Sequence, residues 1–259
     1  MRAFVQGAGL LAPGLEGFSA SRETLAGARP YTFSKIAAPS PQILPPVERR
    51  RTAETVRYAL SVADEALKMS GAPAADIASV FASSGGDGAI LHQICEALAL
   101  PDHAVSPTRF HNSVHNAAAG YWSIATGSHG ASSSLCAYDA TFGAALLDAV
   151  SQVAVDRESV LLAVFDCVFP EPIFTLRPVA QSFAAAFVLT PERNTQTLAQ
   201  WDVAIGAGST ARPNGFPEEI LFNPAARALP LLVQLAKREA RDVAIEYLPG
   251  HHVLVKCEC

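Results

Sequence analysis

Small side chains dominate one face of the helix that we expect over residues 113–125. Three successive alanines from Ala117 onward are followed by Gly120, and the larger Tyr121 and Trp122 lie beyond them. Alanine and glycine leave room for another backbone to approach closely. This helix is therefore expected to pack tightly against a neighbouring element.

Predicted strands and helices alternate along the chain. Short apolar runs bounded by turn residues predict strands, and apolar residues at helical spacing predict helices. We expect strands at residues 3–14, 77–83, 132–137, 160–165, 183–189 and 203–206, with 243–248 and 252–257 as a terminal hairpin or neighbouring strands. We expect helices at 19–26 with Ser19 as N-cap, 52–70, 91–98, 113–125, 139–153 and 224–238, and a loop over 27–46. This interleaved order favours an α/β architecture.

Composition and charge narrow the classes of function. Half of the 259 residues are hydrophobic and 17% are charged, which indicates a packed globular protein rather than a disordered one. A net charge of −5 argues against binding to nucleic acid or to an anionic membrane surface. Five unevenly spaced cysteines do not suggest a disulfide framework. Without a membrane-spanning run or a signal-peptide pattern, we expect a cytoplasmic protein.

Residues 105–150 resemble the central part of the β-ketoacyl synthases of the thiolase superfamily. The stretch reads VSPTRFHNSVHNAAAGYWSIATGSHGASSSLCAYDATFGAALLDAV. That family has an N-x-x-A-G step on a helix, then G-x-x-G-x-S-x-S, then a strand that ends in the nucleophilic cysteine. The counterparts here are Asn116, Ala119-Gly120, Gly127, Gly130, Ser132 and Ser134. Weaker similarities at Val5-x-Gly7-x-Gly9, Arg50 to Gly71, Ser83 to Gly88 and Phe183 to Glu192 extend the resemblance over most of residues 1–210.

The resemblance implies a thiolase-like α/β fold in a single domain, residues 1–259. Catalytic members have a second half that supplies two histidines and a lysine for decarboxylation and condensation. The only histidines after residue 130 are His251 and His252, and neighbours in a strand point to opposite faces. We therefore expect an essentially complete N-terminal half over residues 1–200. Residues 201–259 are expected to be the reduced remnant of a truncated C-terminal half.

The second departure from the family concerns its nucleophile. Counting without gaps from the A-G step places Asp139 at the nucleophile-equivalent position, and Cys136 falls three residues earlier. A carboxylate cannot carry a stable thioester, but at a helix start it can accept the N–H groups of Thr141 or Phe142. We expect no catalytic residue, with Asp139 as an N-cap and Cys136 as a small apolar core residue. A register shifted by three residues would instead make Cys136 the nucleophile.

A shortened second half and the lack of the nucleophilic cysteine are both typical of one subgroup of the family. This subgroup is the chain-length-factor type of subunit in type II polyketide synthases. The resemblance is closest to its small version in aryl-polyene-type systems. It implies a heterodimer with a catalytic ketosynthase, in which this chain shapes the tunnel for an acyl or polyene chain held by an acyl carrier protein. The helix at 113–125 and the strand at 132–137 are expected to pack on that partner. The candidates for the tunnel and the partner interface are Phe110, His111, Asn112, Ser113, His115, Asn116, Trp122 and Phe142.

Metal binding and independent acyl-thioester chemistry are the two alternatives to the role of a partner subunit. His111 and His115 would share one helix face at a spacing that suits a metal, but no third ligand has a matching spacing, so we expect neither a metal nor a cofactor. The alternative function is a free-standing acyl-thioester transferase or decarboxylase that uses Cys136 or Asp139 with His251.

Overall fold

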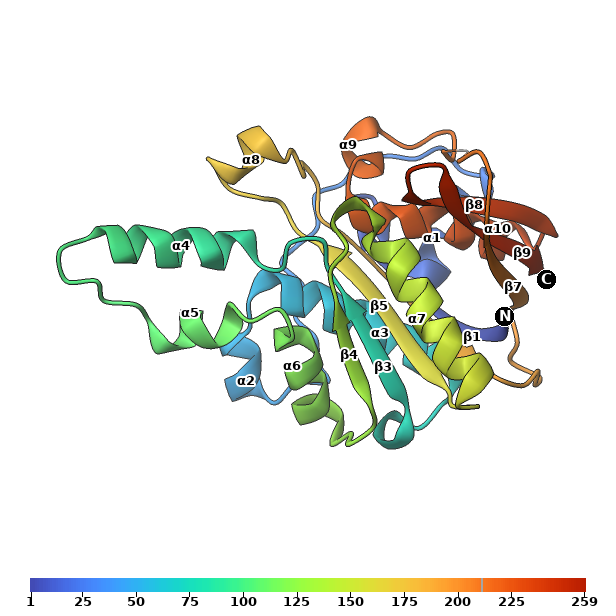
Figure 1. Cartoon of the computed structure of the whole chain (residues 1–259), viewed down its shortest axis with the longest axis horizontal. Coiled ribbons are helices and arrows are strands. Elements are labelled where there is room, and N and C mark those ends of the chain that lie inside the picture. The colour runs from blue at the N-terminus through green and yellow to red at the C-terminus, as the bar shows by residue number, and fades with distance from the viewer. Residues whose placement is uncertain (211) are drawn as a thin grey trace.

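One mixed β-sheet runs through the molecule (Figure 1), and the computed structural model describes residues 1–210 and 212–259. The strands follow the order β4-β3-β5-β6-β1-β7-β9-β8, and β2 pairs with β1. Their bounds are β1 Arg2–Ala12, β2 Leu15–Glu16, β3 Ala78–Ala82, β4 Ser132–Leu135, β5 Val160–Asp166, β6 Phe183–Thr190, β7 Ala199–Gly206, β8 Arg241–Leu248 and β9 His251–Glu258. Strands β3, β4 and β5 run parallel, so their carboxyl ends meet at one end of the sheet.

Helices cover both faces of the sheet, as Figure 1 shows. Their bounds are α1 Phe18–Ala26, α2 Pro46–Arg51, α3 Glu54–Ser70, α4 Gly88–Ala99, α5 Pro107–Asn112, α6 Ala117–Thr126, α7 Thr141–Val155, α8 Ile173–Leu176, α9 Glu218–Leu221 and α10 Leu229–Lys237. One apolar cluster joins α3 and α6 to the sheet, and the other joins α1, α7 and α10 to its opposite face. The side chains of β5 and β6 alternate between the two clusters, as strand geometry requires.

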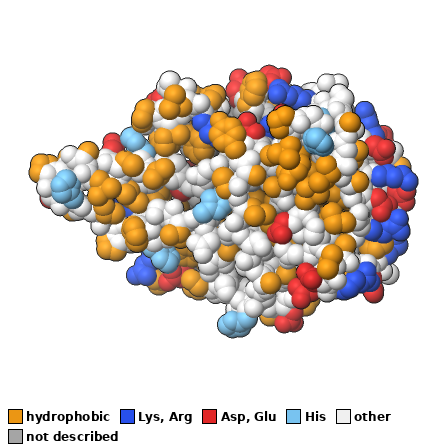
Figure 2. Space-filling model, in the orientation of Figure 1, with side chains coloured by type: hydrophobic (Ala, Val, Ile, Leu, Met, Phe, Trp, Pro, Cys, Tyr) orange, Lys and Arg blue, Asp and Glu red, His pale blue; other side chains and the backbone are white. Residues whose placement is uncertain are grey.

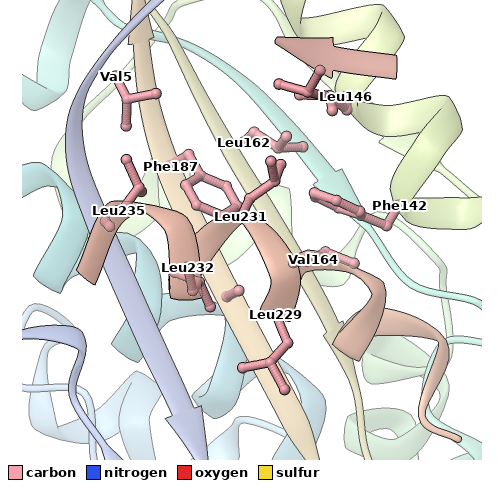
Figure 3. Packing of buried hydrophobic residues seen from close by; sticks show 14 of the residues in the cluster. Val5, Phe142, Leu146, Leu162, Val164, Phe187, Leu229, Leu231, Leu232 and Leu235 are labelled. Atoms are coloured by element: carbon pink, nitrogen blue, oxygen red, sulfur yellow. The ribbon is translucent and has the colours of Figure 1, made fainter. Parts of the chain in front are cut away.

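Aromatic and aliphatic side chains fill the layer between the sheet and α7 with α10 (Figure 3). Phe187 of β6 lies at its centre, with its ring centroid 6.3 Å from that of Phe142 and 5.1 Å from that of Trp201. Leu231 and Leu235 of α10 belong to the same cluster. Since β7, β9 and α10 share this core with β1, β5 and β6, they pack as one body with the preceding strands.

The contact of α3 with β1 is made by backbone atoms. A Cβ atom on Gly7 would lie 2.0 Å from the carbonyl oxygen of Ala66, and one on Gly9 would lie 2.1 Å from that of Val62. Any larger residue at either position would push the helix off the sheet. The two glycines therefore set the distance between these layers.

The predicted α/β architecture and the predicted strands are confirmed, including the terminal hairpin of β8 with β9. Several boundaries differ. The helix expected over 113–125 begins at Ala117, because residues 107–112 form the separate helix α5 and a turn follows it. Residues 46–51 form α2, and the segment 224–238 divides into a 3₁₀ turn and α10.

The prediction that Ser19 caps its helix was wrong. Gly17 occupies the N-cap position of α1, and no side chain of α1 itself caps it. The carboxylate of Glu65 on α3 accepts the N–H of Phe18 at 2.6 Å and that of Leu10 at 3.0 Å. A distant residue therefore supplies the cap, which local sequence cannot show.

The packing of Phe142 leads to a stability prediction. Because its ring is fully buried against Phe187, Phe142→Ala is expected to lower the free energy of unfolding by about 3–5 kcal/mol. Denaturant unfolding measures this loss. Phe33→Ala is the control, since Phe33 is largely exposed, and it should change stability by less than about 0.5 kcal/mol. A Phe142→Ala protein as stable as the control would contradict this packing.

Candidate functional site

Three segments converge where the parallel strands end. Ser83 and Ser84 follow β3, Cys136 follows β4, and Asp166 is the last residue of β5. Hydrogen bonds connect all three segments, because Ser84 bonds to Asp166 through its side chain and to Cys136 through its carbonyl oxygen. This end of the sheet is where α/β folds place their ligand sites, so it is the candidate functional site.

Asp166 organises the site from within the core. It is fully buried, and its Oδ1 accepts the hydroxyls of Ser83 and Ser84 at 2.9 Å each and the N–H of Ser84 at 2.8 Å. The Oδ2 atom has no hydrogen-bond partner. Burial raises the pKa of this carboxyl to about 6, although the bonds from Ser84 and Ser83 favour the charged form. Asn223 fixes the backbone, donating to the carbonyl oxygens of Asp166 and Gln181.

The prediction that Asp139 caps the following helix was wrong. Residues 138–140 form a 3₁₀ turn, and Ala140 holds the N-cap position of α7 without a side-chain bond. This turn directs the Asp139 carboxylate outward, where Oδ1 accepts from an Arg177 guanidinium nitrogen at 2.9 Å. The same guanidinium lies 3.7 Å from the ring centroid of Tyr138. The Asp139 carboxylate is therefore ion-paired and faces solvent.

Cys136 lies on the surface, so its predicted place in the core was also wrong. It follows the last residue of the edge strand β4, where no further strand covers it. Its Sγ donates to the carbonyl oxygen of Ser84 at 3.2 Å. A carbonyl oxygen is not the general base that activates a nucleophilic thiol. The buried thiol of the site is Cys167, whose pKa burial raises well above its ordinary value.

The histidines are placed apart. His111 lies on α5 with its ring 5.7 Å from that of Tyr121. His115 lies in the turn before α6, and its Nε2 is 3.0 Å from the carbonyl oxygen of Ser83. The prediction that His111 and His115 share one helix face was wrong, because helix α5 ends at Asn112, between the two histidines. His251 is exposed and contacts the carbonyl oxygen of Pro249 in its own turn.

The remaining predicted site residues divide between core and surface. Trp122 and Phe142 are buried, and the Trp122 ring centroid lies 6.2 Å from that of Phe81. Asn112 is buried, and its side chain connects α5 to the start of α3. It donates to the carbonyl oxygen of Arg51 and accepts the N–H of Ala53. Ser113 and Asn116 lie in the turn between α5 and α6, and Phe110 is 65% exposed on α5.

Ser83, Ser84, Asp166 and Arg177 were missed as site residues. The Ser83–Gly88 segment was identified as a glycine-rich loop, which pointed to this end of the sheet. The polar residue at the end of the apolar run 160–165 was a usable signal for Asp166. No local pattern marks Arg177, because only the fold brings it to Asp139.

An apolar, unpaired surface adjoins the site. Among residues 1–210 and 212–259, strand β4 pairs with β3 alone, so its other edge is open. Gly120 on the neighbouring α6 faces open space, and Ile124 is half exposed. Helices α4 and α5 project from the body as an arm (Figure 1), and hydrophobic side chains are spread along it (Figure 2). The exposed apolar residues of the arm and the turn after it are Leu91, Leu98, Leu100, Phe110 and Val114.

The titration of Asp166 predicts a pH dependence of stability. Its pKa is about 6 in the folded chain against an ordinary value of 3.8, so the folded state binds the proton more tightly. The free energy by which this proton stabilises the folded chain is on the order of 3 kcal/mol. It is fully present below pH 3.8 and is lost as the pH rises through 6. Asp166→Asn should flatten this part of the profile in urea unfolding between pH 4 and 7. The exposed Asp76→Asn should leave the slope unchanged; an Asp166→Asn profile as steep as the parent would refute the assignment.

Comparisons with known proteins place the chain in a family. The sequence matches the family described as β-ketoacyl synthase, N-terminal domain, over residues 26–238. No curated protein sequence matches it. Within residues 1–210 and 212–259, no helix is long and apolar enough to cross a bilayer. In the same residues, no three His, Cys, Asp or Glu side chains are grouped to hold a metal ion.

Solved structures give the fold. A chain of the ketosynthase ApeO in complex with its chain length factor ApeC from Xenorhabdus doucetiae is 19% identical, with a TM-score of 0.76 and 99% of each chain covered. A chain of the ishigamide ketosynthase/chain length factor is 13% identical, with a TM-score of 0.76, covering 100% of this chain and 99% of that one. A β-ketoacyl synthase from Burkholderia phymatum STM815 is 13% identical, with a TM-score of 0.59, covering 92% of this chain and 71% of that one. The protein has a thiolase-like ketosynthase fold, and since its family match spans well over half of its length, it belongs to the β-ketoacyl synthase family.

Proposed function

We propose that this chain is a non-catalytic, chain-length-factor-like subunit that pairs with a catalytic β-ketoacyl synthase. In this role it shapes the tunnel for an acyl or polyene chain that is elongated on an acyl carrier protein in the cytoplasm. Residues 1–200 supply the core of the subunit, and residues 201–259 are the reduced counterpart of the second half of a catalytic synthase.

The observation that carries the proposal is the chemistry at position 139. A ketosynthase needs a thiolate at the start of a buried helix, where backbone N–H groups and the helix dipole stabilise negative charge. In the gap-free register with the family, Asp139 takes this position, and its carboxylate is ion-paired with Arg177. The thiol of Cys136 bonds to a carbonyl oxygen rather than to a base. The nucleophile must then come from another chain.

The open edge of β4 and the apolar arm support a permanent partner. Unpaired strand edges associate readily with other chains, and β4 carries no charged side chain that would discourage this. Leu91, Leu98 and Phe110 are each at least half exposed, and a partner that covered the arm would remove this apolar surface from water. A ketosynthase that covers β4, α6 and the arm would bury all of these groups.

Co-expression with candidate catalytic β-ketoacyl synthases of the source organism tests the pairing. The expected result is a stoichiometric complex that elongates acyl thioesters, while the purified chain alone has no activity. Asp139→Asn should leave the activity of the complex unchanged, because the carboxylate has no chemical step to perform. Turnover of malonyl or acyl thioesters by the chain alone would instead support the free-standing transferase or decarboxylase.

The surface of the arm is tested in the same complex. Leu98→Asp places a charge on the exposed face of α4 and should weaken the complex at least about tenfold, since a charge buried without a partner is costly. Val155→Asp is the matched control, because Val155 is an exposed residue at the end of α7. Analytical ultracentrifugation measures the affinity of each variant for the synthase. Equal affinities of the two variants would show that the arm is not part of the interface.

Phe110 is an exposed tunnel candidate with a large apolar ring, and it lies on the arm. A large ring at the end of a tunnel limits the length of the chain inside it, so Phe110→Ala in the complex is expected to lengthen the product. Mass analysis of the released chains measures this change, and Phe33→Ala serves as a distant aromatic control. An unchanged product distribution would exclude Phe110 as the residue that limits length.

A further inference from the structure

Two thiols lie side by side where strand β9 ends. Cys257 belongs to the strand, and Cys259 follows directly after its last residue. Their sulfur atoms are 4.0 Å apart. Cys95, Cys136 and Cys167 lie elsewhere, on α4 and after β4 and β5, and β6, β1 and β7 separate β5 from β9 in the sheet. The two sulfurs at the end of β9 therefore form a pair of their own.

The geometry of a strand brings these two sulfurs together. Residues two apart in a strand point to the same face, and here that face lies toward α10. Cys257 packs in the apolar cluster that includes α10, and the sulfur of Cys259 contacts the carbonyl oxygen of Gln234 on that helix. The Cα atoms at this spacing are about 6.6 Å apart, inside the range of about 4.4–6.8 Å that disulfides span. A disulfide can therefore join the pair without rearrangement of the strand.

The two thiols differ in their exposure to solvent. Cys257 is buried beside Trp201, its cross-strand neighbour on β7, and burial raises the pKa of its thiol to about 12. Cys259 is exposed, and its sulfur lies 3.7 Å from the carbonyl oxygen of Glu239. A small reagent in solution therefore meets Cys259 first, and Cys257 lies behind it as a second thiol.

The pair lies away from the surfaces that the proposed synthase would cover. Strand β4 begins the order of the sheet, whereas β9 is next to its other end. In Figure 1 the C-terminus lies on the side of the molecule opposite the arm formed by α4 and α5. The thiol of Cys259 would therefore remain exposed with β4, α6 and the arm covered.

We propose that Cys257 and Cys259 form a redox-active dithiol, which a peroxide converts to a disulfide within the chain. The thiolate of Cys259 attacks one oxygen of the peroxide, the O–O bond breaks, and hydroxide leaves, so that Cys259 becomes a sulfenic acid. The sulfur of Cys257 then attacks that of Cys259, the S–O bond breaks, and water leaves with the proton of Cys257. The two thiols lose two electrons, and hydrogen peroxide gains them and ends as two molecules of water.

The strand spacing also makes the modification reversible. A disulfide between Cα atoms near the upper limit of the usual range is strained, and strained or exposed disulfides are readily reduced by other thiols. The nearby second thiol also protects Cys259, because closure of the disulfide competes with further oxidation to a sulfinic acid. This site does not depend on the proposed pairing with a synthase.

The test treats the reduced chain with hydrogen peroxide and then blocks the remaining thiols with N-ethylmaleimide. Mass spectrometry of the intact protein and of its proteolytic peptides is expected to show a disulfide between Cys257 and Cys259, with the loss of two hydrogen atoms. Reduced glutathione should then restore both thiols. A parent chain in which both thiols remain free, or in which Cys259 becomes a sulfinic acid without a disulfide, would overturn the proposal. A product that resists glutathione would overturn its reversibility.

Variants separate the roles of the two thiols. In Cys257→Ala, the sulfenic acid on Cys259 has no partner, so dimedone should trap it. Cys259→Ala changes an exposed residue and should leave the fold intact, but it should abolish the disulfide and leave Cys257 unmodified. Cys95→Ala is the matched control, because Cys95 is an exposed cysteine away from the pair, and it should leave the disulfide between the other two unchanged. Loss of that disulfide in the control, or a disulfide that joins two molecules through Cys259, would contradict a dithiol within one chain.

Discussion

The backbone contact between β1 and α3 positions the parts of the molecule on which the site depends. Gly7 and Gly9 let the helix rest against the strand with no side chain between them. The first turn of α3 then reaches the site, because Thr55 donates to Asp87 at 3.0 Å and the N–H of Ala53 donates to Asn112. One contact therefore places both the loop after β3 and the base of the arm.

A buried polar network holds the candidate site together. Asp166, the two serines and Asn223 hold the loops at the ends of the parallel strands by hydrogen bonds that are buried from solvent. Such a network specifies one arrangement of the backbone, since each unpaired group would be costly. The exposed pair of Asp139 with Arg177 lies outside this network and contributes little stability by itself.

The sequence predicted the sheet and most helices because alternating and helical apolar patterns are local properties. It did not predict contacts made between distant elements. Glu65 caps α1 across 47 residues, and Arg177 reaches Asp139 across 38. The short helix α5 escaped prediction because its six residues hold few apolar positions and rely on Asn112 to join α2 and α3. Burial of Cys136 was inferred from residue type, whereas its exposure follows from the place of β4 at the edge of the sheet.

The two open edges of the sheet differ in a way that bears on how each is used. Strand β4 is short and uncharged, and it adjoins α6, where Gly120 faces open space. Such an edge has nothing to keep it apart from another chain, so it suits a permanent partner. Strand β8 carries Arg241, Asp242 and Glu246, and charges on an edge oppose indiscriminate pairing. The charges of β8 therefore protect that edge from indiscriminate pairing, whereas nothing comparable protects β4.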